Sequence, residues 1–507
     1  MNRAAPNPWP GRGLALLASL VALWAVMVVH ATGQTLLALT LLVISALAVW
    51  TYTSRATKAL RYLFPGIAAA LVFVIFPMLY TMGIAFTNHS SQNLLDLDRA
   101  RAQLMEEAVI APGSRRGFTL LAQGDRFRVR LNGPAAAITP PVALPEQGTS
   151  AQTVALEPAA TPPTAELPLS AVVQRLPALR QLRLRDDAGQ LLRLTGLREF
   201  ALLQPLYEAQ GDGALTDRLS GKVYRPDMAQ GFFTAADGDR LQHGFRVNVG
   251  LRHFAQVFSE GKFREPFLSV FIWTVVFSAL TVVGTAALGM LLAGLLNWPV
   301  LRGRAAYRLV LFLPYAVPGF ISILVFKGLF NQNLGEVNLI LHALFGIKPA
   351  WFSEPLLAKA MLLIVNIWLG FPYMMVLCSG LIQSIPADLY EASAVVGAGP
   401  WVNFRRITLP LILKPLTPLL ISAFAFNFNN FVLVSLLTGG RPDLADSTLP
   451  AGTTDILVSY TWRIAFQDSG QQFGVAAAIS TVIFLIVATI TLIQLRFTRR
   501  AEASKKG

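Results

Sequence analysis

The chain has 507 residues, of which 54% are hydrophobic and only 14% are charged, and its mean hydropathy is +0.53. This balance excludes an ordinary soluble protein and is typical of a chain that crosses a membrane several times. The net charge of +14 does not indicate nucleic acid, because no basic patch with interleaved aromatics occurs. The single cysteine, Cys378, excludes a disulfide framework and a cysteine-based metal site.

Eight apolar runs are long enough to cross a bilayer, which requires about 17–25 residues. They are Gly13–Val29, Thr35–Tyr52, Leu63–Phe86, Pro266–Leu296, Tyr307–Phe330, Leu356–Leu381, Leu411–Leu437 and Phe473–Leu495. The first run also has features of a signal peptide, since Arg3 and Arg12 precede it and His30-Ala31 offers a weak cleavage site. A second run follows within a few residues, which favours a retained helical hairpin.

Lysine and arginine residues predict the orientation of these spans. With eight spans, the five basic clusters all fall on one side, which the positive-inside rule makes cytoplasmic. Both termini are then cytoplasmic. The clusters are Arg3 and Arg12, then Arg55, Lys58 and Arg61, then Arg302, Arg304 and Arg308, then Arg405, Arg406 and Lys414, and finally Arg496, Arg499, Arg500, Lys505 and Lys506.

A domain-sized segment of mixed charge, about residues 88–264, lies on the opposite side of the membrane. The alternating stretches Arg126–Leu131 and Leu182–Arg185 predict half-buried strands. Between them, residues 134–168 are rich in Pro, Ala and Thr and indicate an extended or mobile linker. We expect a small β-rich domain that contacts a soluble partner, with a disordered spacer as the alternative.

The polar stretch between the sixth and seventh runs has the pattern of two helices joined by a tight turn. Ser384 and Pro386 fit a helix start, with serine as the cap and proline in the first turn. Asp388 lies where the helix dipole favours an anion. Gly397 breaks this helix and Pro400 can open the next. We predict a rigid helix-turn-helix exposed to the cytoplasm over about residues 384–410, with an ordinary capped surface helix as the alternative.

The same stretch resembles the E-A-A-x3-G-x9-I-x-L-P signature of the membrane subunits of binding-protein-dependent ABC importers. The matching positions are Glu391, Ala392, Ser393, Gly397, Ile407, Leu409 and Pro410. The spacing agrees throughout, and only Ser393 departs from the pattern, where alanine is usual. The resemblance implies that this loop grips an ATPase, that Glu391 pairs with an arginine on that ATPase, and that Gly397 allows the tight turn.

The chain has no G-x-x-x-x-G-K-[ST] loop for nucleotide phosphates. The pairs Gly221-Lys222 and Gly261-Lys262 lack both the upstream glycine and the following Ser or Thr. We therefore expect a transport subunit rather than an enzyme, with ATP hydrolysis on a separate subunit.

The seventh run carries asparagines and phenylalanines in its middle. Amides in a span are costly unless they find partners, and Asn427 and Asn430 share a helix face. In the sixth run Asn366, Leu369, Gly370 and Tyr373 form one stripe, and in the fifth run Tyr315 and Gly319 lie beside Pro314 and Pro318, which should disrupt or kink the helix.

Two interpretations of these amides remain open. Singly, each could join helices, a contribution of about 0.6–2 kcal/mol. As a set, amides with flat aromatic faces favour a site for a neutral, hydroxyl-rich ligand. The runs carry almost no interior acid or base, with Lys327 near the outer end of its helix. This argues against an ion- or proton-driven carrier.

From about Arg264 to the C-terminus, the chain resembles the MalF family, the larger permease subunits of maltose importers. The resemblance rests on residues 313–318, 348–352 and 368–373 and on the asparagine-rich run. It implies an all-α polytopic fold of eight transmembrane helices, the type I ABC importer transmembrane domain, with a β-rich periplasmic insertion. It also implies a location in the bacterial inner membrane. The expected division is a hairpin at 1–62, a third span at 63–87, a periplasmic domain at 88–264 and a transporter core at 265–507.

The resemblance also implies a sugar site and a set of partners. The site residues would be Tyr315, Asn366, Leu369, Gly370, Tyr373, Phe426, Asn427 and Asn430. Gly319 stands where a small hydroxyl residue is expected in a maltose site. The implied partners are a MalG-like second permease, two copies of a MalK-like ATPase and a periplasmic maltose-binding protein, and no cofactor or metal is expected.

Two other functions remain open from the sequence. The same importer could carry another disaccharide or oligosaccharide such as trehalose, because Gly319 cannot donate a hydrogen bond from a side chain. The large outer segment alone would also suit a membrane-anchored periplasmic sensor or scaffold, although such a protein needs neither the coupling loop nor the amide stripe.

Overall fold

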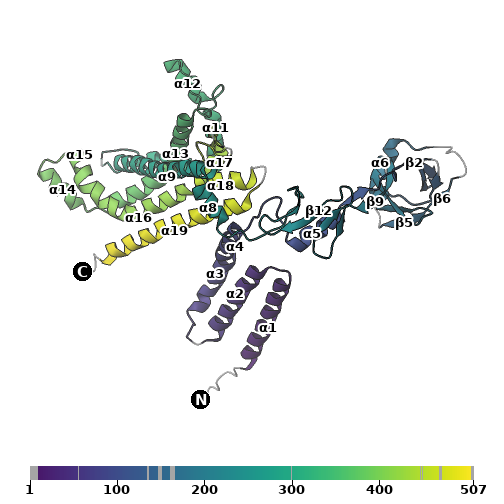
Figure 1. Cartoon of the computed structure of the whole chain (residues 1–507). Coiled ribbons are helices and arrows are strands. Elements are labelled where there is room, and N and C mark those ends of the chain that lie inside the picture. Colours follow the sequence, from purple (N-terminus) through teal and green to yellow (C-terminus); the bar gives the residue numbers. More distant parts are fainter. Residues whose placement is uncertain are drawn as a thin grey trace. The chain divides into compact units, whose positions relative to one another are not determined.

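A computed structural model describes residues 9–54, 56–133, 136–146, 151–159, 166–298, 300–445, 447, 449–467 and 471–503. Of the basic residues used to predict orientation, Arg3, Arg55, Lys505 and Lys506 lie outside these ranges, as do the side chains of Arg12, Arg499 and Arg500. The chain forms two compact units (Figure 1). Unit 1 comprises Met1–Ser91 with Asn248–Gly507, and unit 2 comprises Gln92–Val247.

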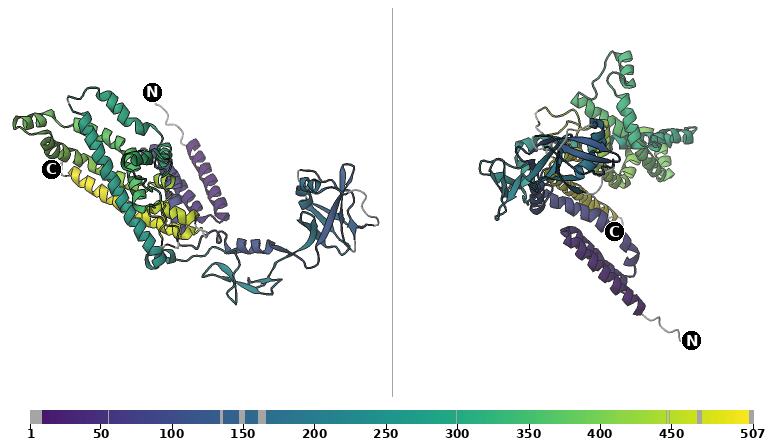
Figure 2. Two further views of the ribbon diagram at one scale, coloured as in Figure 1. Left: turned by 90° about the horizontal axis from the view of Figure 1, so that it is seen from above. Right: turned by 90° about the vertical axis from the view of Figure 1, so that its right-hand side faces the viewer.

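Unit 1 is helical, and several of its long helices run side by side (Figure 2). Its helices are α1 (Trp9–Ala31), α2 (Thr35–Thr53), α3 (Leu60–Ala70), the π-helix η1 (Leu71–Ile75), α4 (Phe76–Ala85), α8 (Arg252–Ser259), α9 (Gly261–Leu296), α10 (Arg304–Ala316), α11 (Gly319–Leu329), α12 (Glu336–Phe345), α13 (Pro355–Gln383), α14 (Ala387–Val395), α15 (Pro400–Asn403), the π-helix η2 (Phe404–Thr408), α16 (Leu409–Phe428), α17 (Phe431–Leu437), α18 (Leu457–Phe466) and α19 (Phe473–Ala503).

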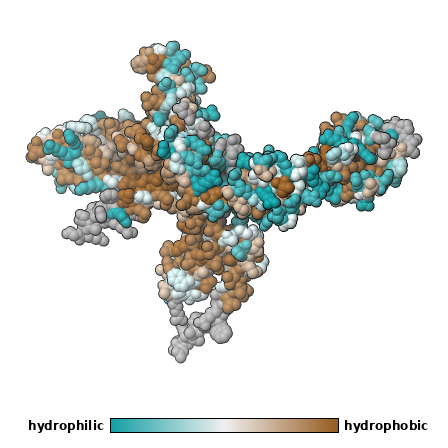
Figure 3. Space-filling view, in the orientation of Figure 1, coloured by the Kyte–Doolittle hydropathy of each residue, from teal (hydrophilic) through white to brown (hydrophobic). Residues whose placement is uncertain are grey.

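The predicted count of eight spans is supported only in part. Among the described residues, six helical stretches are long and apolar enough to cross a membrane, and the α10–α11 pair makes a seventh if counted as one span. The expected first span is α1, but its described apolar stretch, Leu16–Ala31, is shorter than the others. The outer surfaces of these helices are strongly apolar, whereas unit 2 has a mixed, more hydrophilic surface (Figure 3).

Two runs expected as single helices are broken. The predicted span Tyr307–Phe330 is divided into α10 and α11, which meet at 90° across Val317-Pro318, because a proline has no N–H and its ring crowds the preceding turn. The predicted span Leu411–Leu437 is divided into α16 and α17 at Asn429-Asn430. The first break confirms the disruption predicted at Pro314 and Pro318. The second break was not predicted, because the run length alone was read as one span.

The contact between α9 and α13 forms the centre of unit 1, and glycine makes it close. A Cβ added at Gly289 would lie 2.7 Å from the Cβ of Met374 and 2.7 Å from the backbone nitrogen of Met375. At Gly370 an added Cβ would lie 2.8 Å from the Cγ2 of Thr285. Small residues at membrane helix contacts allow such close backbone approach, so these two glycines fix the spacing of the helices that carry the candidate site.

Unit 2 contains two antiparallel-rich sheets and short helices. The first sheet has nine strands in the order β5-β7-β8-β9-β2-β3-β4-β6, with β1 paired to β9, and the second is β10-β11-β12-β13. Its elements are α5 (Leu97–Glu106), β1 (Ala108–Ile110), β2 (Arg116–Gln123), β3 (Arg126–Leu131), β4 (Ala137–Ile138), β5 (Gln152–Ala155), β6 (Glu157–Pro158), α6 (Leu169–Gln174), α7 (Leu176–Gln181), β7 (Leu182–Arg185), β8 (Leu191–Gly196), β9 (Glu199–Pro205), β10 (Tyr207–Ala209), β11 (Leu215–Asp217), β12 (Val223–Asp227) and β13 (Phe232–Ala235).

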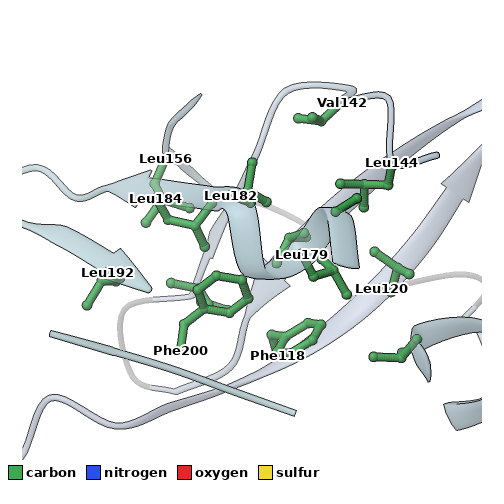
Figure 4. Packing of buried hydrophobic residues seen from close by; sticks show 14 residues of the cluster. Phe118, Leu120, Val142, Leu144, Leu156, Leu179, Leu182, Leu184, Leu192 and Phe200 are labelled. Carbon is green, nitrogen blue, oxygen red and sulfur yellow. The ribbon is translucent and has the colours of Figure 1, made fainter. Parts of the chain in front are cut away.

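The core of unit 2 is built from alternate strand residues and the buried side of α7 (Figure 4). Phe118 and Phe200 meet edge-to-face with ring centroids 5.1 Å apart, and Leu179 from α7 is fully buried in the same cluster. The predicted strands at Arg126–Leu131 and Leu182–Arg185 are confirmed as β3 and β7. The alternation of apolar and charged residues predicted these strands correctly because every second side chain of a strand points into the core.

The predicted linker over residues 134–168 is wrong in its described parts. β4, β5 and β6 all lie within it and pair with the sheet, and β5 pairs in parallel with β7 through Gln152↔Leu182. The disordered-spacer alternative is contradicted by the same strands. The β5–β7 pairing joins residues about 30 positions apart, so local composition carries little information about it.

The loop between α17 and α18 is held by a buried ion pair. The Arg463 guanidinium donates to the Asp455 carboxylate over 2.7 Å, and the Asp455 side chain is fully buried. The same carboxylate accepts from the backbone of Gly452 at 2.8 Å and from the Ser459 hydroxyl at 2.7 Å. Arg463 also pairs with Asp443, whose side chain is 54% exposed.

This unequal burial predicts unequal losses of stability. Asp455→Ala would leave a buried guanidinium short of its compensating charge, at a cost of roughly 3–5 kcal/mol. Asp443→Ala removes an exposed partner of the same arginine and should cost at most about 1 kcal/mol. Thermal unfolding of the detergent-solubilised chain measures both variants, and equal shifts would contradict the assigned role of the buried pair.

Candidate functional site

A cavity of about 1160 Å³ lies in unit 1 among α9, α10, α11, α13, α16 and α17. All eight residues predicted from the sequence to contact a ligand line it, and Gly319 lines it as well. The predicted residues in the cavity wall are Tyr315, Asn366, Leu369, Gly370, Tyr373, Phe426, Asn427 and Asn430. The structure therefore brings the whole predicted set together, although it contains no ligand that would test their role.

The two helix breaks place irregular backbone at this cavity. Residues 314–319 form one part of the wall and residues 425–433, apart from Phe428, form another. In a membrane, non-helical backbone is tolerated where it is buried in protein or lines a polar cavity. The breaks and the cavity thus depend on each other.

A chain of amide hydrogen bonds connects α16 and α13. Asn427 Nδ2 donates to the carbonyl of Ala423 at 2.8 Å, and Asn427 Oδ1 accepts from Asn366 Nδ2 at 2.8 Å. Asn366 Nδ2 also donates to the hydroxyl of Thr281 on α9 at 3.1 Å, and Asn366 Oδ1 accepts from Asn430 Nδ2 at 3.3 Å. Asn366 and Asn427 are buried, whereas Asn430 is half-buried.

Aromatic rings complete the cavity wall and remain accessible. Phe426 is 70% exposed, Tyr315 is 55% exposed and Tyr373 is 44% exposed in the isolated chain. Such rings can cover the apolar faces of a sugar, while tyrosine hydroxyls can bond its polar edge. Asn427 and Asn430 both line the cavity, but α16 ends at Phe428 and Asn430 lies beyond it, so the two do not share one helix face as predicted.

The described residues that line the cavity include no charged side chain. Lys327 lies in the last turn of α11 and donates from Nζ to the Leu436 carbonyl at 3.1 Å, and it is not part of the wall. An ion or a charged ligand would find no counter-charge among these residues. The wall therefore suits a neutral ligand with many hydrogen-bonding groups.

Several lining residues were not found by sequence reasoning. They are polar side chains on α9 and in the broken helices: Thr281, Thr285, Ser422 and Asn429. Threonine and serine commonly return a hydrogen bond to their own helix, as Thr285 does to the carbonyl of Thr281 at 2.8 Å. Only the amide of Asn366 on the facing helix distinguishes Thr281 from such residues.

The predicted helix-turn-helix is present as α14, a turn, and α15 followed by η2. Gly397 adopts a φ of +74° in the turn, and the backbone N–H of Ala398 donates to the Ser393 carbonyl at 3.0 Å. Pro400 opens α15, and the Tyr390 hydroxyl bonds that of Thr408 at 2.9 Å. These contacts join the two arms into one rigid protrusion.

One detail of that prediction is wrong. Ser384 does not cap α14, because it ends α13 and its hydroxyl donates to the Leu381 carbonyl at 2.7 Å. Helix α14 begins at Ala387 after Pro386, and Asp388 lies in its first turn as expected.

The protrusion presents two acids, Asp388 and Glu391, and several apolar side chains to solvent. Glu391 is exposed and forms no ion pair with the described residues. Val395 is 88% exposed, Val396 is 80% exposed and Trp401 is 70% exposed. Apolar side chains this exposed beside carboxylates are typical of a contact surface. Of the remaining motif residues, Ile407 and Leu409 are half-buried, while Ala392 and Pro410 are exposed.

Comparison with known proteins identifies the family. Three family models match in chain order. "MalF, N-terminal region, transmembrane helices" covers residues 9–56, "Maltose transport system permease protein MalF P2 domain" covers 95–250, and "Binding-protein-dependent transport system inner membrane component" covers 285–502. The maltose/maltodextrin transport system permease protein MalF of Vibrio parahaemolyticus is 48% identical over 489 residues, which cover 94% of this chain and 93% of that protein. This chain belongs to the MalF family.

The agreement extends over nearly the full length. The MalF protein of Escherichia coli K12 is 47% identical over 493 residues, which cover 96% of each chain. The family resemblance stated from the sequence is therefore confirmed, as are the ABC importer transmembrane fold and the β-rich insertion. The MalF-family chain described here is an inner-membrane transport component rather than a catalytic domain.

The turn geometry predicts that Gly397 is required and Gly399 is not. An added Cβ meets nothing within 4 Å at either glycine, but only Gly397 has a positive φ. Gly397→Ala should therefore strain the turn by roughly 1–2 kcal/mol, which increases its local opening about 5- to 30-fold. Trypsin cleavage after Arg405 and Arg406 measures this opening in the purified chain, and equal rates for Gly397→Ala and Gly399→Ala would contradict the prediction.

Proposed function

We propose that this chain is the membrane-spanning permease subunit of an ATP-driven, binding-protein-dependent importer of maltose and maltodextrins. The observation that carries the proposal is the neutral cavity lined by amides and aromatic rings, in a chain of the MalF family. Sugar would pass through this cavity by alternating access between outward-facing and inward-facing states.

The proposal assigns a role to each part of the chain. The sugar contacts are the eight residues predicted from the sequence, and residues 384–410 couple the permease to the ATPase. Residues 1–62 form an N-terminal hairpin, 63–87 the third span, 88–264 a periplasmic domain and 265–507 the transporter core. Both termini then lie in the cytoplasm.

The partners follow from the same chemistry. The chain has no phosphate-binding loop, so a MalK-like ATPase dimer would supply hydrolysis. The exposed apolar and acidic surface of α14 and α15 fits that ATPase, with Glu391 facing an arginine. A MalG-like second permease would complete the pathway, and a periplasmic maltose-binding protein would dock on the outer side.

Another neutral disaccharide, such as trehalose, is a second candidate cargo because of Gly319. This residue lines the cavity at the first position of α11, where an added Cβ meets nothing within 4 Å. The space could hold a small hydroxyl side chain, which glycine does not provide. Competition by unlabelled sugars during uptake separates the two cargoes.

Asn430→Ala should reduce maltose uptake roughly 5- to 150-fold, because it removes an amide that faces the cavity. Association with the ATPase should stay unchanged, since the coupling loop is untouched. Asn333→Ala is the control, as this exposed asparagine lies outside the cavity wall. ATP-driven uptake into vesicles measures the loss, and unchanged uptake in Asn430→Ala would remove this residue from the site.

Glu391→Ala should weaken binding of the ATPase. Loss of one partner of a desolvated interface pair typically costs about 2–5 kcal/mol, so affinity should fall at least about tenfold. Asp388→Ala is the matched control, because it removes an exposed acid from the same helix outside the motif. Co-purification of the ATPase measures both variants, and retention by Glu391→Ala equal to that of the control would contradict the coupling role.

A further inference from the structure

The amide bonds beside the cavity form a chain with a fixed direction. Its starting point is the Ala423 carbonyl, which can only accept, so Asn427 must turn its NH₂ group toward it. Asn427 then directs Oδ1 toward α13, where only the NH₂ group of Asn366 can donate a hydrogen bond to it. A flipped amide at either position would bring two acceptors together. The order of the relay is therefore set by one backbone carbonyl.

The same logic determines the cavity end of the relay. With its NH₂ group facing Asn427 and Thr281, Asn366 can only offer Oδ1 to Asn430. Asn430 therefore donates inward from Nδ2. Its Oδ1 accepts no hydrogen bond from the described residues, and Asn430 lines the cavity.

Thr281 accepts the second hydrogen bond that the NH₂ group of Asn366 can donate. Both N–H groups of Asn366 are used, one by Asn427 and the other by the Thr281 hydroxyl oxygen. Thr281 is 1% exposed and Asn366 is 5% exposed, so an unused N–H at this point would have little access to water. Thr281 thus holds the plane of the Asn366 amide from α9, a third helix.

We propose that Thr281 is a positioning residue for the ligand site. It locks the relay Ala423–Asn427–Asn366–Asn430 so that Asn430 turns its carbonyl oxygen to the cavity and accepts a hydrogen bond from a ligand hydroxyl. In this arrangement Asn366 and Asn427 orient Asn430, and Asn366 has no N–H group left to donate to the ligand. The ligand role rests on the proposed function, whereas the relay itself does not.

Three variants separate positioning from simple packing. Thr281→Val keeps the shape but removes the acceptor, Thr281→Ser keeps the hydroxyl, and Ser278→Ala removes another buried hydroxyl of α9 that only bonds the Thr274 carbonyl. We expect Thr281→Val to lower the maximal uptake rate at least about fivefold, with Thr281→Ser and Ser278→Ala near the wild type. Equal loss in Thr281→Val and Ser278→Ala, or no rescue by serine, would overturn the proposal.

A double-mutant cycle tests the link to Asn430. If Thr281 acts through the relay, Thr281→Val should cause no further loss of uptake in an Asn430→Ala background. A full additional loss, equal to that in the wild-type background, would show that Thr281 acts independently and would overturn the proposal.

A second cycle tests the relay without any assumption about cargo. Thermal unfolding of the purified full chain is compared for Thr281→Val, Asn366→Ala and the double variant. We expect the double variant to unfold at the temperature of Asn366→Ala alone, because the bond is already lost. Additive shifts would overturn the relay, whereas a non-additive cycle together with no maltose uptake by the wild-type complex would retain the relay and contradict only the proposed function.

Discussion

Backbone polar groups inside a bilayer have no water to bond, and this constraint governs where the chain can interrupt its helices. Among the described residues, two predicted spans are interrupted, one at Val317-Pro318 and the other at Asn429-Asn430. Both interruptions line one cavity, the kind of place where irregular backbone is tolerated in a membrane. The position of the cavity is therefore a consequence of the same prolines and asparagines that would destabilise an ordinary span.

The amides near the break between α16 and α17 differ in how deeply they are buried and in what they bond. Asn427 and Asn366 are buried and satisfy one another across α16 and α13, and Thr281 adds α9. Among the described lining residues, Asn429, Asn430 and the tyrosine and phenylalanine faces remain partly accessible. This arrangement reconciles the two interpretations that the sequence left open, because some of the amides join helices while the outermost one is available to a ligand.

The features of the fold and the site that could be predicted are those encoded by residues close together in the sequence. The coupling loop follows from spacing within about 27 residues of sequence, and its turn at Gly397 and helix start at Pro400 were found. The strands β3 and β7 followed from alternation. The cavity residues were named from the family resemblance and a helical stripe, and all of them reach one cavity.

What could not be predicted was set by distant contacts. The asparagines at the α16–α17 break were interpreted as part of a continuous helix face, and such a stripe does not show that the helix ends at Phe428. Within residues 134–168, β5 pairs with β7 and β4 pairs with β6, and neither partner is close in sequence. Thr281 resembles any helical threonine until the amide of Asn366, 85 residues away in sequence, is placed against it.

The measurement that tests the account most directly is ATP-driven uptake of labelled maltose into vesicles that hold this chain with its second permease, ATPase and binding protein. The account predicts accumulation that requires both ATP and the binding protein. ATP hydrolysis stimulated by the binding protein without maltose uptake would contradict the sugar assignment, and Gly319 would then be the first residue to change.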